Sequence, residues 1–329
     1  MSTATSVDVF DLLHGELDEM DARIVETVDI GIPQVNEMVR EVVTSGGKRL
    51  RPTILLLTGR AFAPDHRALI DAAAGIELLH TASLVHDDDI DHSALRRGRP
   101  TLSTQVSSVT AILIGDYLFA QSAILAASTN STRVVAVFAS TLADLCRGQI
   151  REMLESHRLE QTFEEYEQRI YGKTGSLFAG AAEMGAILGG ADDGTIAELR
   201  AYGRELGIAF QIIDDILDLR EMTGSIGKPA GNDLREGTVT LPIMRYDAGL
   251  RDGSPERTLL SDIINGDVTD DASINEVVAS IRRSGALDEA AAIAGQYVDN
   301  ARSHLSVVPD SQTRHYLTQI TDLVLDRST

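Results

Sequence analysis

A long stretch of the chain, residues 101–228, contains no proline. All eight prolines of the sequence lie outside it, and the stretch is rich in Ala, Leu, Ile and Glu, which favour helices. Aromatic residues make up only 4% of the chain, and no run of alternating β-branched residues persists, so no sheet is predicted. We expect an all-α bundle of roughly ten or more helices, with residues 1–329 forming one domain.

Charge and hydropathy narrow the class of protein. The formal net charge is −21, which argues against broad nucleic-acid binding and against docking on anionic lipid. The acidic N-terminus lacks the pattern of a signal peptide, and no apolar run approaches the roughly 20 residues that span a bilayer. The lone cysteine, Cys146, is expected to pack as a small hydrophobe. We expect a cytoplasmic protein without an integral membrane segment.

Lysine is rare in this sequence, and all lysines share one sequence context. The three lysines, Lys48, Lys173 and Lys228, each follow a glycine, in SGGKRLRP, IYGKTGS and SIGKPAG. The alternative is chance placement of a rare residue. A compact point charge beside flexible backbone suits phosphate binding, which we take as the better interpretation.

The stretch VHDDDIDHSALRRGRP carries an unusual density of charge. Asp87, Asp88 and Asp91 form the pattern DDxxD, and on a helix Asp87 and Asp91 share one face, joined by Asp88 from its other side. Asp89 points elsewhere. One such cluster alone could equally be a solvated helix N-terminus, where acidic residues favour the dipole.

The stretch AFQIIDDILDL repeats this geometry with Asp214, Asp215 and Asp218 between apolar residues. Buried carboxylates are costly unless they are paired, and hard cations such as Mg²⁺ offset that cost with oxygen ligands. Because Mg²⁺ usually bridges carboxylates to substrate phosphates, two such clusters indicate a diphosphate substrate.

These motifs resemble those of the all-trans polyprenyl diphosphate synthases, in the isoprenoid synthase type I family. LLHTASLVHDDDIDHSALRRGRPT is similar to the first aspartate-rich motif of that family, FQIIDDILDL to the second, and the resemblance extends from GGKRLRP to GKPAGNDLREGTVTLP. It implies a helical bundle whose two aspartate-rich helices face one another across a cavity, and it implies a homodimer.

The resemblance also implies roles for single residues. The expected contacts to isopentenyl diphosphate are Lys48, Arg51, His80 and Arg97. The expected contacts to the allylic diphosphate are Arg96, Lys173, Thr174, Gln211 and Lys228. The expected direct Mg²⁺ ligands are Asp87, Asp91 and Asp214, with Asp88, Asp215 and Asp218 acting through metal or water. The catalytic group is then Asp87, Asp88, Asp91, Lys173, Asp214 and Asp215.

Some positions receive no role in the site. The family often has a lysine where this chain has Thr238, so one phosphate contact is missing there. His80 could be a buried histidine satisfied by backbone, but its place two turns before the aspartates favours the site. His86 and His92 are taken as structural. Glu77 resembles a family position and is equally explained by packing.

The implied reaction is ionisation, condensation and elimination. The double bond of isopentenyl diphosphate attacks an allylic carbocation, and a proton is then lost to the departing diphosphate, so no protein general base is assigned. A terpene cyclase would not need a second diphosphate site, and an HD-type hydrolase would need further histidine–aspartate pairs. A non-catalytic subunit of a heteromeric synthase stays an alternative, although such subunits usually lack an aspartate-rich motif.

Product length depends on what closes the cavity below the first motif. Ser83 and Ala82 lie one turn before Asp87, about 5.4 Å along the axis, and both are small, while Leu79 and Ile76 follow deeper. Because a cavity without a floor accepts a longer chain, the resemblance implies a product of roughly C30 to C50 and a role in quinone biosynthesis. A short-chain farnesyl or geranylgeranyl diphosphate synthase is the alternative.

Overall fold

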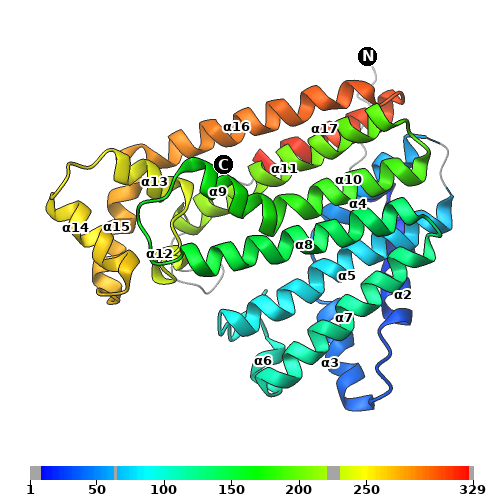
Figure 1. Ribbon diagram of the computed structural model, residues 1–329, viewed down its shortest axis with the longest axis horizontal. Helices are drawn as coiled ribbons and strands as arrows, with labels where there is room; N and C mark the ends of the chain where they lie inside the picture. The colour runs from blue at the N-terminus through cyan, green and yellow to red at the C-terminus, as the bar shows by residue number, and fades with distance from the viewer. Residues whose placement is uncertain (1–8, 63–64, 221–229, 326–329) are drawn as a thin grey trace. The chain divides into compact units, whose positions relative to one another are not determined.

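The computed structural model describes residues 9–62, 65–220 and 230–325 (Figure 1). Its described chain is almost entirely helical, and its residues group into two compact units. Unit 1 comprises the described residues up to Leu142 together with Leu177–Gly203 and His304–Ile320. Unit 2 comprises Ala143–Ser176, the described residues of Arg204–Ser303, and those that follow Thr321. The all-α prediction is confirmed, and the single-domain prediction stays a prediction.

Unit 1 is built around two long helices that pack side by side, α5 (His66–Ile90) and α7 (Ser108–Ser128). Seventeen residues of α5 are buried, from Ala68 to Asp88, so α5 is the core helix of this unit. The other elements of unit 1 are α1 (Val9–Leu12), α2 (His14–Thr27), α3 (Pro33–Val43), α4 (Leu50–Arg60), β1 (Leu95–Arg96), β2 (Arg99–Pro100), α6 (Leu102–Gln105) and the 3₁₀ turn Leu305–Val307.

Unit 2 contains the π-helical turn Tyr171–Gly175 directly after α9 (Phe163–Ile170). Its other complete helices are α12 (Asn232–Arg235), α13 (Leu241–Ala248), α14 (Pro255–Asn265) and α15 (Asp271–Ser284). Further helices contribute residues to both units: α8 (Thr132–Glu155), α10 (Ser176–Gly189), α11 (Asp193–Arg220), α16 (Ala286–His304) and α17 (Ser311–Leu325).

A two-residue hairpin turn, which the sequence did not predict, carries the arginine pair that follows the first aspartate motif. β1 and β2 are antiparallel, with Leu95 opposite Pro100 and Arg96 opposite Arg99. Between them Arg97 and Gly98 have φ of 51° and 76°, which is the geometry of a type I′ turn. Arg97 therefore adopts a left-handed conformation that non-glycine residues seldom take.

Two described helices, α5 and α7, are long and apolar enough to span a membrane by length and composition, which corrects the expectation that no segment approaches this length. In α5, 89% of the apolar window is buried within the protein, so its apolarity is that of a core helix. In α7 only 39% is buried, and its exposed side chains include Val109, Ile112, Leu113 and Ile124.

Helices α10 and α4 approach closely at Gly185. A methyl group there would overlap the hydroxyl of Thr58 and the backbone carbonyl of Leu55. Gly185→Ala should therefore destabilise the protein by about 2 kcal/mol, because an overpacked backbone contact cannot relax cheaply. Gly295→Ala is the matched control, since nothing lies within 4 Å of its added methyl, and it should stabilise α16 slightly. Urea unfolding measures both, and equal effects would contradict the close approach.

Candidate active site

The first aspartate motif lies at the carboxyl end of α5. The helix ends at Ile90, and Asp91 is its C-cap, whose backbone N–H donates to the carbonyl of Asp87 at 2.8 Å. Acidic side chains are disfavoured at this end because the helix dipole is negative there. The alternative of a solvated helix N-terminus is therefore wrong, and the site favours a bound cation.

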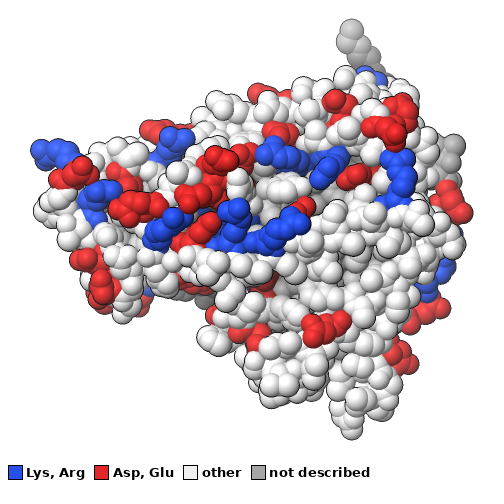
Figure 2. Space-filling view, in the orientation of Figure 1, with Lys and Arg blue, Asp and Glu red and all other residues white. Residues whose placement is uncertain are grey.

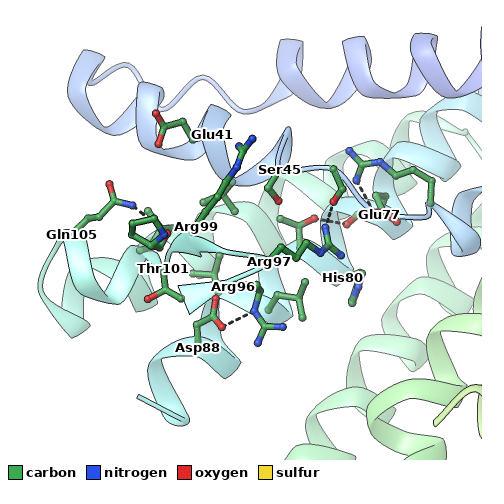
Figure 3. Close-up of a pocket in the computed structure, with 18 residues that line it drawn as sticks. Glu41, Ser45, Glu77, His80, Asp88, Arg96, Arg97, Arg99, Thr101 and Gln105 are labelled. Atoms are coloured by element: carbon green, nitrogen blue, oxygen red, sulfur yellow. Dashed lines mark hydrogen bonds and ion pairs between the residues drawn. The ribbon is translucent and has the colours of Figure 1, made fainter. Parts of the chain in front are cut away.

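Two residues with separate predicted roles, Arg96 and Asp88, contact each other. Arg96 Nε donates to Asp88 Oδ1 at 2.6 Å, and the Asp88 side chain is only 9% exposed (Figure 3). The pair is held by the hairpin, which carries Arg96 back over the end of α5. Asp88 is thus neutralised by the chain itself, and the assigned metal and allylic roles of this pair stay predictions.

A cavity of about 350 Å³ in unit 1 opens beside this motif. Arg97 donates to the carbonyl of Gly46, which ties the hairpin to the glycine loop before α4. Figure 3 shows Arg96, Arg97 and His80 around the cavity, with Glu77 beside His80. Its titratable lining residues are Glu41, Arg49, Glu77, His80, Asp88, Arg96, Arg97 and Arg99.

The surroundings of His80 lower the pKa of its imidazole. Burial is the largest cause that holds its pKa well below the usual value, followed by the positive charges of Arg51, Arg97, Arg96 and Arg49. Its buried Nδ1 has no hydrogen-bond partner. An imidazole satisfied by backbone is therefore not what the structure contains. Four guanidiniums around one imidazole make a site suited to an anion.

The two other predicted contacts to isopentenyl diphosphate, Lys48 and Arg51, lie at the start of α4. Lys48 is exposed in the loop before α4, and Arg51 lies in the first turn of α4 with its guanidinium 4.8 Å from the ring centroid of Phe178. Neither lines the cavity as described. Arg51 nevertheless belongs to the group of charges that surrounds His80.

Arg49 is a residue of this site to which the sequence gave no role. It is the left-handed N-cap of α4, with φ of 48°, and its guanidinium contacts the carboxylates of Glu77 at 2.6 Å and Asp21 at 2.9 Å. Because both partners come from other helices, α5 and α2, the pairing appears only in the folded chain. Glu77 is therefore a packing partner of the GGKRLRP loop.

The second aspartate motif lies near the carboxyl end of α11. Asp215 is 4% exposed, whereas Asp214 and Asp218 are partly exposed. The side chain of Asp218 accepts from the backbone N–H of Asn232 at 3.1 Å and of Asp233 at 3.2 Å. Asp218 thus holds the start of α12 and the chain that leads to EGTVTLP. All three aspartates are helical, as predicted.

Three predicted substrate and metal residues of unit 2 form one hydrogen-bonded chain. Thr174 donates to Gln211 Oε1 at 2.6 Å, and Gln211 Nε2 donates to Asp215 Oδ1 at 2.9 Å. Lys173 and Thr174 lie in the π-helical turn, a distortion common at functional sites. Lys173 forms an ion pair with Glu152 of α8.

Further acidic residues gather around this motif. Burial, and then the charges of Asp218 and Asp215, raise the pKa of Asp233 well above its usual value. Burial also raises the pKa of Asp215 to about 7. Asp233 and Glu152 were missed by the sequence analysis, although Asp233 lies in the quoted stretch GNDLREGT. Carboxylates that disfavour one another's charge fit a cation site.

The donor set suits a hard cation that is shared with a substrate. Within the described ranges, no group of three or more His, Cys, Asp or Glu side chains is arranged to hold a metal ion. Mg²⁺ is usually bound by one or two carboxylates with waters and substrate phosphates rather than by a complete protein cage. The residues present therefore fit Mg²⁺ bound together with a diphosphate.

Three further residues that the sequence analysis named are His86, Thr238 and Lys228. His86 Nε2 donates to the backbone carbonyl of Ile112 at 3.0 Å, and the ring packs on Phe119, in agreement with a structural role. Thr238 donates its backbone N–H to the carbonyl of Asp233 at 2.8 Å. Lys228 lies outside the described residues.

The expectation for Cys146 is wrong. Cys146 is exposed on α8, because its neighbours Leu145 and Gly148 take the buried positions of that helical turn. The sequence around Cys146 shows no periodic pattern strong enough to predict which face of this helical turn is buried.

Comparisons with known proteins agree with this geometry. The family model described as polyprenyl synthetase matches residues 32–281. "Heptaprenyl diphosphate synthase component 2" of Geobacillus stearothermophilus is 35% identical, over 94% of this chain and 95% of the relative. "Short chain isoprenyl diphosphate synthase" of Methanothermobacter thermautotrophicus is 36% identical, over 98% and 99%.

Solved structures give the same result. A decaprenyl diphosphate synthase from Rhodobacter capsulatus is 34% identical with a TM-score of 0.90, covering 98% of each chain. A polyprenyl synthase from Caulobacter crescentus, complexed with calcium and isoprenyl diphosphate, is 32% identical with a TM-score of 0.92, covering 98% of this chain and 97% of that one. The predicted resemblance, the all-α fold and the prenyltransferase class are confirmed, whereas the roles of single residues stay predictions.

The lowered pKa of His80 gives a testable pH dependence. The unfolded chain binds a proton at this histidine near pH 6.5, and the folded chain binds one only at much lower pH. Between these values the unfolded state holds more protons, so stability is lost as pH falls. His80→Gln should therefore lose less stability than the unmodified protein between pH 7 and pH 5, measured by urea unfolding. Equal losses would show that His80 is not held neutral.

Proposed function

Because this chain belongs to the polyprenyl synthetase family, we propose that it is a Mg²⁺-dependent trans-prenyltransferase that condenses isopentenyl diphosphate with an allylic diphosphate. The observation that carries this proposal is the arginine-lined cavity around His80, which lies beside an aspartate motif at the carboxyl end of a helix. An anion site next to a cation site is what a metal-bound diphosphate and a second, metal-free diphosphate require.

Lys48, Arg51, His80 and Arg97 are proposed to bind isopentenyl diphosphate. The proposal is supported by the shared charge environment of Arg51, Arg97 and His80. A neutral His80 offers one N–H donor and one acceptor, so its Nδ1 can donate to a phosphate oxygen in the matching tautomer. The guanidiniums supply positive charge, and the imidazole supplies a hydrogen bond that orients the phosphate.

Asp87, Asp91 and Asp214 are proposed as direct Mg²⁺ ligands, with Asp88, Asp215 and Asp218 in supporting positions. The supporting positions are consistent with the hydrogen bonds of their side chains, since Asp88 accepts from Arg96, Asp215 from Tyr166 and Asp218 from the backbone N–H of Asn232. The proposed contacts to the allylic diphosphate are Arg96, Lys173, Thr174, Gln211 and Lys228.

The proposed reaction needs charge stabilisation on the leaving group. When bound, Mg²⁺ supplies Lewis-acid stabilisation of the departing diphosphate. Lys173 and Arg96 add positive charge at fixed positions, which is worth most where water is excluded. The isopentenyl double bond then attacks the allylic carbon, and the proton leaves to the released diphosphate. The guanidiniums around His80 hold the second substrate still during this step.

Assembly and location remain to be assigned with the activity. The relative named as a synthase component suggests that a subunit of a heteromeric enzyme is the second candidate. We favour a catalytically complete chain, because both aspartate motifs are present. We place it in the cytoplasm, as its composition predicts.

The first test of this function is metal dependence. Asp87→Ala should lower kcat by about a thousandfold, because several kcal/mol of charge stabilisation are lost. Asp89→Ala is the control on the same helix, since Asp89 accepts a hydrogen bond from Ser108 at 2.7 Å. Incorporation of labelled isopentenyl diphosphate, with EDTA or Mg²⁺, measures both. An inactive unmodified chain, or a fully active Asp87→Ala variant, would overturn the proposal.

A medium or long product is proposed from the residues below the first motif. Ala82 and Ser83 are small and buried, and Leu79 and Ile76 follow on the same buried helix. The relatives include both a heptaprenyl and a short-chain synthase, so identity alone does not decide the length. The absence of an aromatic side chain at this turn supports the longer product.

Ala82→Phe should shorten the product, because the ring would fill the space beneath Asp87. Chromatography of products made with excess isopentenyl diphosphate measures this, and thermal unfolding shows whether the variant is folded. Ser93→Ala, beyond the end of α5, is a control that should leave the length unchanged. If the unmodified enzyme stops at farnesyl or geranylgeranyl diphosphate, the long-chain assignment is wrong.

A second copy of the chain is proposed to cover the apolar face of α7. That face exposes Val109, Ile112, Leu113 and Ile124, with exposed fractions between 42% and 67%. Figure 2 shows a largely uncharged surface where α7 lies in Figure 1. In a chain of net charge −21, such a face favours a stable apolar contact.

Leu113→Lys should convert the dimer to a monomer, because it places a charge in the proposed contact. Leu323→Lys is the control, since Leu323 is also exposed and lies on α17. Light scattering after gel filtration gives the mass of each. A monomeric unmodified protein would mean that a different subunit, or nothing, covers α7.

A further inference from the structure

A buried tyrosine, Tyr166, lies beneath the second aspartate motif. Its side chain is fully buried, and its hydroxyl donates to Asp215 Oδ2 at 2.7 Å. The other oxygen of the same carboxylate accepts from Gln211 Nε2. Asp215 is therefore held on both sides, by a donor from α9 and a donor from its own helix.

This arrangement fixes the orientation of Gln211 and Thr174. Because the Gln211 amide nitrogen donates to Asp215, its oxygen faces Thr174 and accepts the Thr174 hydroxyl proton at 2.6 Å. The direction of the hydrogen bonds that link Tyr166 to Thr174 therefore depends on the position of the Asp215 carboxylate. Of these four hydrogen-bonded residues, Tyr166 is the one that belongs to α9.

Tyr166 itself has little freedom to move. The guanidinium of Arg169 lies 5.6 Å from its ring centroid. Arg169 is 2% exposed and donates to the Val239 carbonyl at 2.5 Å and to Gln161 Oε1 at 2.8 Å. The ring is thus packed against a side chain that is anchored at two points, so the position of its hydroxyl is set by packing.

We propose that Tyr166 is a positioning residue for the reaction, which holds Asp215 and, through it, Gln211 and Thr174 in the geometry that binds the metal–diphosphate group. This inference rests on the proposed function. Tyr166 does not touch the substrate. Its hydroxyl donates to Asp215 from α9, whereas Gln211 donates from α11 itself, so Tyr166 ties the motif to α9.

Removing only the hydroxyl separates this role from packing. Tyr166→Phe keeps the buried ring but leaves Asp215 Oδ2 without its donor. Loss of a partner that orients a metal-binding group usually costs about 10- to 100-fold in metal affinity or activity. We expect a shift of this size in the Mg²⁺ concentration for half-maximal activity, with a raised KM for the allylic substrate. The KM for isopentenyl diphosphate should stay within about twofold, because its proposed contacts lie on other elements.

Tyr202→Phe is the matched control. Tyr202 is also fully buried, and its hydroxyl makes one hydrogen bond, to the Leu317 carbonyl at 2.9 Å. Both variants lose one buried hydroxyl, so both should lose similar stability. Only Tyr166→Phe should change the Mg²⁺ dependence. Binding is measured independently of turnover, as the rise in unfolding temperature on adding inorganic diphosphate with Mg²⁺.

The outcomes distinguish this inference from the proposed function. A smaller thermal shift and a raised Mg²⁺ requirement in Tyr166→Phe alone support the positioning role. An active unmodified enzyme with the same Mg²⁺ requirement in Tyr166→Phe overturns it, as do equal changes in both variants. An unmodified protein without prenyltransferase activity rejects the proposed function instead, and the thermal shift then still tests whether Tyr166 supports binding.

Discussion

Negative charge at the carboxyl end of a helix is the constraint on which the candidate site depends. Asp87 and Asp88 lie in the last turn of α5, and Asp218 lies in the last turn of α11, where the dipole disfavours acidic groups by about 0.3–1 kcal/mol each when exposed. The chain compensates Asp88 with Arg96, Asp215 with Tyr166 and Gln211, and Asp218 with backbone N–H groups. A divalent cation is proposed to bind Asp87, Asp91 and Asp214 when it is present.

Adjacent aspartates in each motif have different tasks because consecutive helical residues point about 100° apart. Asp88 and Asp215, the second residues of the two pairs, are 7% and 4% exposed, whereas Asp87 and Asp214 are partly exposed. The inner aspartate binds the scaffold, and the outer one is placed toward solvent. In the proposed function, the outer aspartate of each pair is a metal ligand, and the inner aspartate orients the helix turn that carries it.

Local patterns predicted what depends on helical periodicity, and tertiary contacts decided the rest. The all-α fold, the helical aspartates and the joint environment of Arg51, His80 and Arg97 follow from spacing and from family motifs. The pairing of Arg49 with Glu77 and Asp21 joins three elements, and so does not show in the sequence. Tyr166 and Asp233 were missed for the same reason. Cys146 was misplaced because a lone residue gives no periodicity.

The glycines before Lys48 and Lys173 allow close backbone contacts that the sequence did not suggest. A methyl group at Gly47 would lie 3.0 Å from the Arg97 guanidinium, and one at Gly172 would lie 2.7 Å from Gly148. These glycines thus allow another part of the chain to approach the backbone closely. At Gly172 the approaching helix is α8, which also supplies Glu152 to Lys173. The glycine therefore brings the partner of the lysine within reach, and the GK pair is a packing motif that places a charge.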